Sequence, residues 1–247
     1  MMRPLQTQAQ RVCASGDIRA KAGECLCVVD KAPQNECRVY VEKGATLYHY
    51  RFCDANDARV DVQVEEGGYY EVLSLLTSGG AQKIFVSLNG TGAESKSDAV
   101  YVLKDDDKGS FETKIVHNAD DTVSSQLIKG AASGNSEETF EGTILIPSGH
   151  KGVDGSQQHR AVLLSDKASV MAVPRLEIYS DDVKCAHGSA IGDLDEYQLY
   201  YLQTRGIPEA EAKKILVSAF LNEVTDTVND EALRDEFSKR IEAALPF

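Results

Sequence analysis

Cys185 and His187 are the residues whose types and spacing most directly suggest chemistry in this sequence. Thiolate sulfur and imidazole nitrogen both bind iron and iron–sulfur species. Residues two apart on a β-strand face the same side, so this pair would present one sulfur and one nitrogen together. Two ligands leave a site incomplete, which predicts that a partner chain supplies the others. In the alternative interpretation, Cys185 packs in the core and His187 hydrogen-bonds a neighbouring segment.

Five further cysteines and four further histidines carry weaker signals. The cysteines all fall within the first 53 residues: Cys13, Cys25, Cys27, Cys37 and Cys53. Their spacings do not form paired CxxC motifs. Cys25 and Cys27 would face one side of a strand, so a metal site there is an alternative to buried thiols. The histidines His49, His117, His150 and His159 lack ligand-type neighbours at suitable spacing and are predicted to be structural or on the surface.

Enzymatic motifs are missing from the sequence. It contains no Gly-x-Ser-x-Gly elbow, Walker motif or His-Glu-x-x-His motif. A carbohydrate-active enzyme would need paired carboxylates. The adjacent Asp181 and Asp182 would face opposite sides of a strand. We therefore expect no enzymatic activity.

Composition limits the partners and the location. The 247 residues carry a net charge of -13, and no basic cluster suited to nucleic acid is present. No apolar run approaches the ~18 residues that a membrane span requires. The N-terminus has no apolar signal region, so we expect a cytoplasmic protein whose cysteines are free thiols.

The chain from about Cys25 to Tyr179 has strand character. Short β-branched and aromatic segments of period two alternate with Gly-, Asn- and Asp-rich turns. Clear examples are 38–41, 60–64, 83–88, 99–103, 114–117 and 143–146. Hairpin turns are scarce, Asn89-Gly90 being the clear one, and this favours a β-solenoid over a sandwich or barrel.

Helical signals begin near Gly192. Asp193 and Glu196 have capping-box spacing, Gly206 ends the first helix, and Pro208 begins the second. Asn229 or Asp230 caps a third helix. Three short amphipathic helices leave more apolar residues than so small a bundle can bury. We therefore predict that a face with Ile215, Ala219 and Phe220 binds a partner.

One long run carries a family resemblance. It extends from Pro174 to Gly192 and includes Leu176-Glu177-Ile178-Tyr179 and Asp181-Asp182-Val183-Lys184-Cys185-Ala186-His187-Gly188. The pattern continues in Leu194-Asp195-Glu196, Tyr200-Tyr201-Leu202, Arg205-Gly206-Ile207 and Ala219-Phe220, and begins upstream in 140–144 and 157–165. This run resembles the SufB/SufD family of iron–sulfur cluster assembly scaffold proteins, in its SufD form, over roughly residue 88 to the C-terminus.

The resemblance implies a mainly β fold, a right-handed parallel β-helix followed by a small C-terminal α-helical domain. It implies a 1–30 N-terminal segment, a 31–191 β-helix core and a 192–247 helical domain. It also implies a scaffold that binds SufB through the β-helix and the ATPase SufC through the helices. His187, with Cys185 beside it, would then contact a transient iron–sulfur cluster at the SufB interface, with no tightly bound cofactor.

The sequence departs from that family at its N-terminus, because most of the usual N-terminal region is missing. A shortened or repurposed chain is therefore an alternative. In that case the protein would be a purely structural β-solenoid that binds partners, or a second copy of itself, without a metal role. A carbohydrate-active β-helix enzyme is the third and weaker alternative.

Overall fold

The computed structural model describes residues 16–31 and 35–247. Within them, fourteen strands form two parallel sheets of seven strands each. The odd-numbered sheet contains, in spatial order, β1 (Ile18–Ala20), β3 (Glu36–Val41), β5 (Ala58–Val64), β7 (Gly80–Leu88), β9 (Lys108–His117), β11 (Glu137–Ile146) and β13 (Ser169–Ile178). The even-numbered sheet contains β2 (Cys25–Asp30), β4 (Thr46–Cys53), β6 (Tyr69–Leu76), β8 (Glu94–Leu103), β10 (Val123–Ala132), β12 (Val153–Leu163) and β14 (Val183–Asp193).

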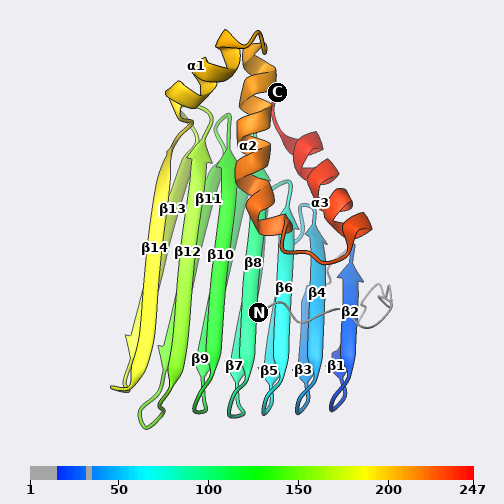
Figure 1. Cartoon of the computed structure of the whole chain (residues 1–247), viewed down its shortest axis with the longest axis vertical. Helices are drawn as coiled ribbons and strands as arrows, with labels where there is room; N and C mark the ends of the chain where they lie inside the picture. The colour runs from blue at the N-terminus through cyan, green and yellow to red at the C-terminus, as the bar shows by residue number, and fades with distance from the viewer. Residues whose placement is uncertain (1–15, 32–34) are drawn as a thin grey trace.

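Consecutive strands belong to opposite sheets, and each strand pairs in parallel with the strand two places later. Each odd–even pair of strands is therefore one coil, and the coils stack side by side (Figure 1). This arrangement confirms the predicted parallel β-solenoid and excludes a sandwich of hairpins. Asn89-Gly90 joins β7 to β8 across the two sheets, so it is a coil corner and not a hairpin turn.

The interior between the sheets is a stack of aliphatic rows. One row on the odd-numbered sheet runs through seven strands in register: Ile18, Val39, Val62, Val86, Ile115, Ile144 and Leu176. All of them are buried except Leu176 in the last coil, which is partly buried. β-branched side chains suit such rows because they pack well on a pleated surface. This stacking is why short segments of period two form one continuous core.

Three helices follow the strands: α1 (Glu196–Thr204), α2 (Glu209–Thr225) and α3 (Glu231–Ala244). The cap of α1 differs from the sequence prediction, because Asp193 is the last residue of β14 and Asp195 accepts the capping hydrogen bonds. The other signals are confirmed: Gly206 has a positive φ of 84°, and Asp230 caps α3. None of the described helices combines the length and apolar character that crossing a bilayer requires.

The outer face of the even-numbered sheet is covered by α2 and α3, which lie across it in Figure 1. Sheet and helical region share one apolar cluster. The sheet contributes Cys27, Val29, Tyr48, Tyr50, Phe52, Leu73, Leu75, Val100, Val102 and Ala131. The helical region contributes Val217, Leu221, Val224, Val228, Leu233, Phe237, Ile241, Ala244 and Leu245. β4 is consequently buried on both faces. The helices therefore bury most of their apolar residues against the outer face of this sheet, and not only among themselves.

The strands also extend the β-region beyond the predicted boundaries. β1 and β2 lie within 18–30, a segment assigned to the N-terminal region, because both pair with strands of the two sheets. At the other end, β14 continues to Asp193 through pairing with Leu163 of β12. The solenoid accordingly runs from Ile18 to Asp193.

Candidate functional site at the end of the solenoid

The last coil, formed by β13 and β14, is the open end of the solenoid. Within the described part of the chain, each of these strands pairs on one side only, β13 with β11 and β14 with β12. Inward-facing side chains that are buried in the other coils are therefore uncovered here. The exposed fractions of Ile178 and Ile191 reach 38% and 39%, and that of Met171, on the same coil, is 56%. An unpaired strand edge with apolar side chains is a typical pairing surface.

Cys185 lies on β14 in register with Gly155 of β12. Its Sγ is 3.3 Å from the point that a Cβ on Gly155 would occupy, and it packs beside the buried Ile144 and Val153. The sulfur therefore points into the lumen. Burial raises the pKa of the Cys185 thiol, so the protonated thiol is its resting form at neutral pH. A metal ion would have to displace that proton, because the thiolate is the ligand form.

His187 is the next inward position on β14, in register with Gln157. Unlike Cys185, it is exposed, because no coil covers β14 on the other side. The structure thus places Cys185 and His187 on one face of β14, at the open end of the solenoid. Cys185 is partly covered, and His187 is accessible. The described residues hold no group of three or more His, Cys, Asp or Glu side chains arranged for a metal. The pair can supply two ligands only.

The coil beneath the end coil contributes one buried histidine, His159 of β12. His159 is buried, in register with Ser189 of β14, and stacks on the ring of Phe140 at 5.1 Å. Its Nε2 lies 3.3 Å from the hydroxyl oxygen of Tyr101. Burial lowers the pKa of His159 to about 4, so this imidazole is neutral at physiological pH. Sequence analysis had assigned His159 to structure or surface, and it is a packed structural residue.

The other histidines and cysteines are also structural. His49 is buried with Nδ1 at 3.1 Å from the hydroxyl of Tyr70, and His117 contacts two hydroxyls inside the solenoid. Cys25 and Cys27 face the same side, as predicted, but they pack beneath the helices. Burial raises the pKa of Cys27 to about 12, which opposes metal binding. Cys13 lies outside the described residues, and the other cysteines are free thiols.

Asp181 and Asp182 are the carboxylate pair considered for a carbohydrate-active enzyme. Asp181 and Asp182 lie in the exposed turn between β13 and β14 and not on a strand, so the expected opposite-facing geometry does not apply. Two adjacent carboxyl groups in one exposed turn differ from the separated pair, one on each side of the bond, that glycoside hydrolysis uses.

The predicted helical surface is divided between two faces of α2. Ile215 and Ala219 are exposed on the outer side, whereas Phe220 is half-buried toward the sheet. The ammonium of the buried Lys129 lies 4.3 Å from the centre of the Phe220 ring and donates to the Phe220 carbonyl and the Glu223 carboxylate. Phe220 therefore helps to hold α2 on β10.

Exposed tyrosines on α1 form a surface that sequence analysis did not separate from the helix core. Tyr197, Tyr200 and Tyr201 expose 87%, 67% and 57% of their surface, and no residue of α1 is buried. The missed signal was their spacing of three and four residues, which places all three tyrosines on one face of a nine-residue helix. Tyrosine is enriched at protein interfaces, and α1 packs next to α2.

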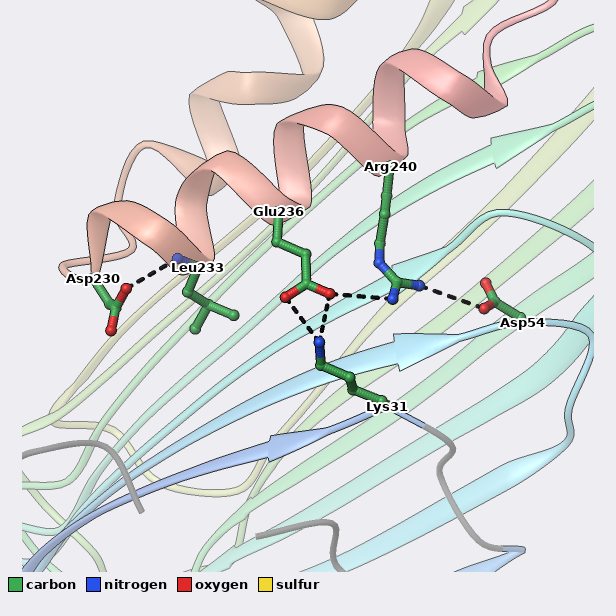
Figure 2. Close-up of polar contacts among 6 residues, drawn as sticks. All are labelled: Lys31, Asp54, Asp230, Leu233, Glu236 and Arg240. Carbon is green, nitrogen blue, oxygen red and sulfur yellow. Dashed lines mark hydrogen bonds and ion pairs between the residues drawn. The ribbon is translucent and has the colours of Figure 1, made fainter. Parts of the chain in front are cut away.

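α3 is fixed to the first coils by an ion-pair network. Figure 2 shows Glu236 and Arg240 reaching from α3 toward Lys31 and Asp54, at the ends of β2 and β4. Glu236 lies 2.7 Å from Lys31 and 3.2 Å from Arg240, and Arg240 lies 3.6 Å from Asp54. The guanidinium of Arg240 also lies 4.3 Å above the ring of Phe52. These contacts orient the helical layer relative to the coils.

Fold and site together define a parallel β-solenoid that exposes ligand-type side chains at its open end and carries a helical layer on one sheet. Comparison with known proteins gives the family. Residues 26–220 match the family described as "SUF system FeS cluster assembly, SufBD core domain". The chain belongs to this SufBD family of iron–sulfur cluster assembly proteins. The match begins well before residue 88, where the sequence resemblance was placed.

Individual relatives agree with the SufD side of the family. The chain is 32% identical over 159 residues to the iron-sulfur cluster assembly protein SufD of Escherichia coli (strain K12), covering 64% of this chain and 38% of that protein. It is 31% identical over 156 residues to SufD of Bacillus subtilis (strain 168), covering 63% and 36%. It is 29% identical over 215 residues to the chloroplastic protein ABCI7 of Arabidopsis thaliana, covering 84% and 45%. The chain thus spans less than half the length of these relatives.

Proposed function

We propose that this chain is a non-enzymatic, SufD-like scaffold subunit that presents His187 and Cys185 to a nascent iron–sulfur cluster. The observation that carries the proposal is the placement of both side chains on inward positions of an uncovered last coil. A site with two ligands from this chain binds cargo only when a second chain adds ligands. Such a site suits a transient cluster that is assembled and then passed on. The cluster is the cargo here and not a resident cofactor.

The open end is the surface we assign to a SufB-like partner. Its edge strands offer unpaired backbone groups, and Ile178 and Ile191 offer apolar contact area. Strand addition to an exposed sheet edge combines main-chain hydrogen bonds with side-chain contacts. A partner strand added there would cover His187 and exclude water from the cargo. The same pairing could also join two copies of this chain, which is the competing homodimer.

The helical surface is the one we assign to a SufC-like ATPase. α1 exposes Tyr197, Tyr200 and Tyr201, and the neighbouring outer face of α2 exposes Ile215 and Ala219. This surface lies at the far end of the helical layer from the α2–α3 turn (Figure 1). The assignment retains Ile215 and Ala219 from the sequence prediction and replaces Phe220 with the tyrosines of α1.

Surface variants test these partners better than truncation. Removing the helices would uncover the aromatic outer face of the even-numbered sheet, including Tyr50 and Phe52. A truncated chain would therefore lose binding through aggregation. Phe220→Asp has the same defect, because it would place a carboxylate in the contact between α2 and β10.

The test is co-expression of the chain with the SufB-like and SufC-like proteins of its own source, followed by purification through a tag on this chain. We expect all three proteins to be recovered together. Recovery of the chain alone, with a solution mass of one or two copies, would overturn the partner assignments. It would favour the purely structural solenoid instead.

A further inference from the structure

The lumen beneath the end coil contains a buried amide that none of the contacts above uses. Gln157 on β12 is fully buried, and neither its Oε1 nor its Nε2 has a hydrogen-bond partner among the described residues. Buried polar groups in folded proteins are nearly always paired, since an unpaired one is unfavourable. This side chain therefore requires a specific explanation.

On the opposite side of the lumen, β11 has a glycine at the point that the Gln157 amide approaches. A Cβ added to Gly142 of β11 would lie 1.5 Å from Nε2 of Gln157. Any other residue at this position would therefore displace the glutamine head. Glycine within a strand weakens the strand and often marks a close approach of another group. Here the close approach is made by the Gln157 side chain.

Two inward residues of the end coil cover this part of the lumen. Pro174 of β13 is in register with Gly142, and His187 of β14 is in register with Gln157. The proline side chain has no hydrogen-bonding group, whereas the imidazole has one donor and one acceptor when neutral. Adjacent strands lie about 4.8 Å apart, so two polar side chains neighbour the amide at that spacing: Gln126 of β10, one coil deeper, and His187 in the end coil.

We propose that Gln157 is a positioning residue for His187: its amide, unpaired in the structure, would turn toward the end coil so that Oε1 accepts the hydrogen bond of one ring N–H. The bonded nitrogen then keeps its proton, and the lone pair of the other nitrogen is directed to the open end. A hydrogen bond to one ring nitrogen commonly fixes the tautomer of a ligating histidine in this way. This inference rests on the proposed function, because the tautomer matters when His187 supplies a nitrogen to the cargo.

Gln126 provides a matched control. It lies on β10 in register with Gln157, one coil deeper in the same lumen. It is also buried, and both of its amide atoms lack partners among the described residues. Gln126→Met and Gln157→Met therefore remove the same group from equivalent surroundings, but only Gln157 neighbours His187.

The experiment is ¹⁵N NMR of the full chain with labelled histidine, at a pH where His187 is neutral. The His187 signals are assigned by their loss in His187→Ala. We expect one dominant tautomer in the wild type and in Gln126→Met, and in Gln157→Met the mixture that a free imidazole adopts in water. Gln157→Glu keeps the shape and an acceptor, so it should retain the wild-type tautomer.

An unchanged His187 tautomer in Gln157→Met, or equal changes in the two Met variants, would overturn the inference. If Gln157→Met does not fold, a mixed His187 tautomer in Gln157→Glu would overturn it. The proposed function fails separately, when His187→Ala leaves cluster assembly in the complex unchanged. The NMR result does not depend on that assembly.

Discussion

Lys31 and Glu236 form an ion pair between residues 205 positions apart in the chain, with Nζ 2.7 and 3.0 Å from the two carboxylate oxygens. Lys31 directly follows β2 and Glu236 lies in α3, so the contact fastens the last helix to the first described coil. Both side chains are partly exposed, at 44% and 27%. Such pairs contribute up to about 1 kcal/mol, so the apolar layer beneath must supply most of the attachment.

The first prediction compares these two contributions. Phe237 is fully buried and stacks on Phe52 with ring centres 4.4 Å apart. Phe237→Ala should lower the free energy of unfolding by about 3–5 kcal/mol, whereas Glu236→Ala should lower it by less than about 1 kcal/mol. Urea unfolding of the two variants measures both. Equal losses would mean that the ion pairs, and not the apolar layer, hold α3.

The second prediction concerns the buried ammonium of Lys129. Glu223→Ala leaves that charge beneath α2 without its carboxylate, while Lys129→Met removes the charge and keeps an apolar stem. Because an unpaired buried charge costs more than its replacement by an apolar group, Glu223→Ala should destabilise the protein more than Lys129→Met. In the Lys129→Met background, Glu223→Ala should have little effect. Equal effects of Glu223→Ala in both backgrounds would contradict the ion pair.

The third prediction is a pH dependence. Glu138 is buried in the solenoid, and burial raises its pKa to about 8. Between about pH 4.5 and 8 the folded state keeps a proton that the unfolded state has lost, so stability falls as pH rises, by about 1.4 kcal/mol per unit at most. Glu138→Gln should flatten this slope and be the more stable protein at pH 8. Parallel stability–pH curves for the two proteins would contradict the assignment.

The fold was largely predictable, because its signals are local and repeated. Valines and isoleucines at period two, with Gly, Asn and Asp at the corners, indicate many short strands, and the scarcity of hairpin turns favours a solenoid over a sandwich. The parallel β-helix itself was implied by the family resemblance. The position of the helices was not predictable. In Tyr48-His49-Tyr50-Arg51-Phe52 the three aromatic residues all face outward, and His49 and Arg51 face the lumen. A single sequence does not reveal that α3 covers the outward face.

The sequence identified the two candidate ligand residues of the site, but it did not show where in the fold they lie. Cys185 and His187 have a recognisable spacing, and a strand places them on one face. The accessibility of His187 depends on β14 being the last strand of its sheet, which is a property of the stacking order. Gln157 was missed because its register with His187 joins residues thirty positions apart, and no local pattern in the sequence marks that pairing.

The fourth prediction separates the two proposed partner surfaces. Ile191 is exposed on the end coil, and Ile215 is exposed on α2, at 39% and 42%. Ile191→Asp should abolish recovery of the SufB-like protein and leave the SufC-like protein bound. Ile215→Asp should do the reverse, because each carboxylate is placed in one apolar surface only. Co-purification with either variant measures both partners, and circular dichroism checks that both variants remain folded. Loss of the same partner from both variants would contradict the assignment of two surfaces.

Contact between His187 and the cluster can be measured by cluster reconstitution. The complex is reconstituted anaerobically with iron and sulfide, and cluster absorbance is compared for the wild type, His187→Ala and the control Ser189→Ala. Ser189 is the next inward position on the same exposed strand. We expect His187→Ala to lose most of the absorbance while its partners still co-purify, and Ser189→Ala to keep it. Wild-type absorbance in His187→Ala would contradict the account and leave the chain a purely architectural role.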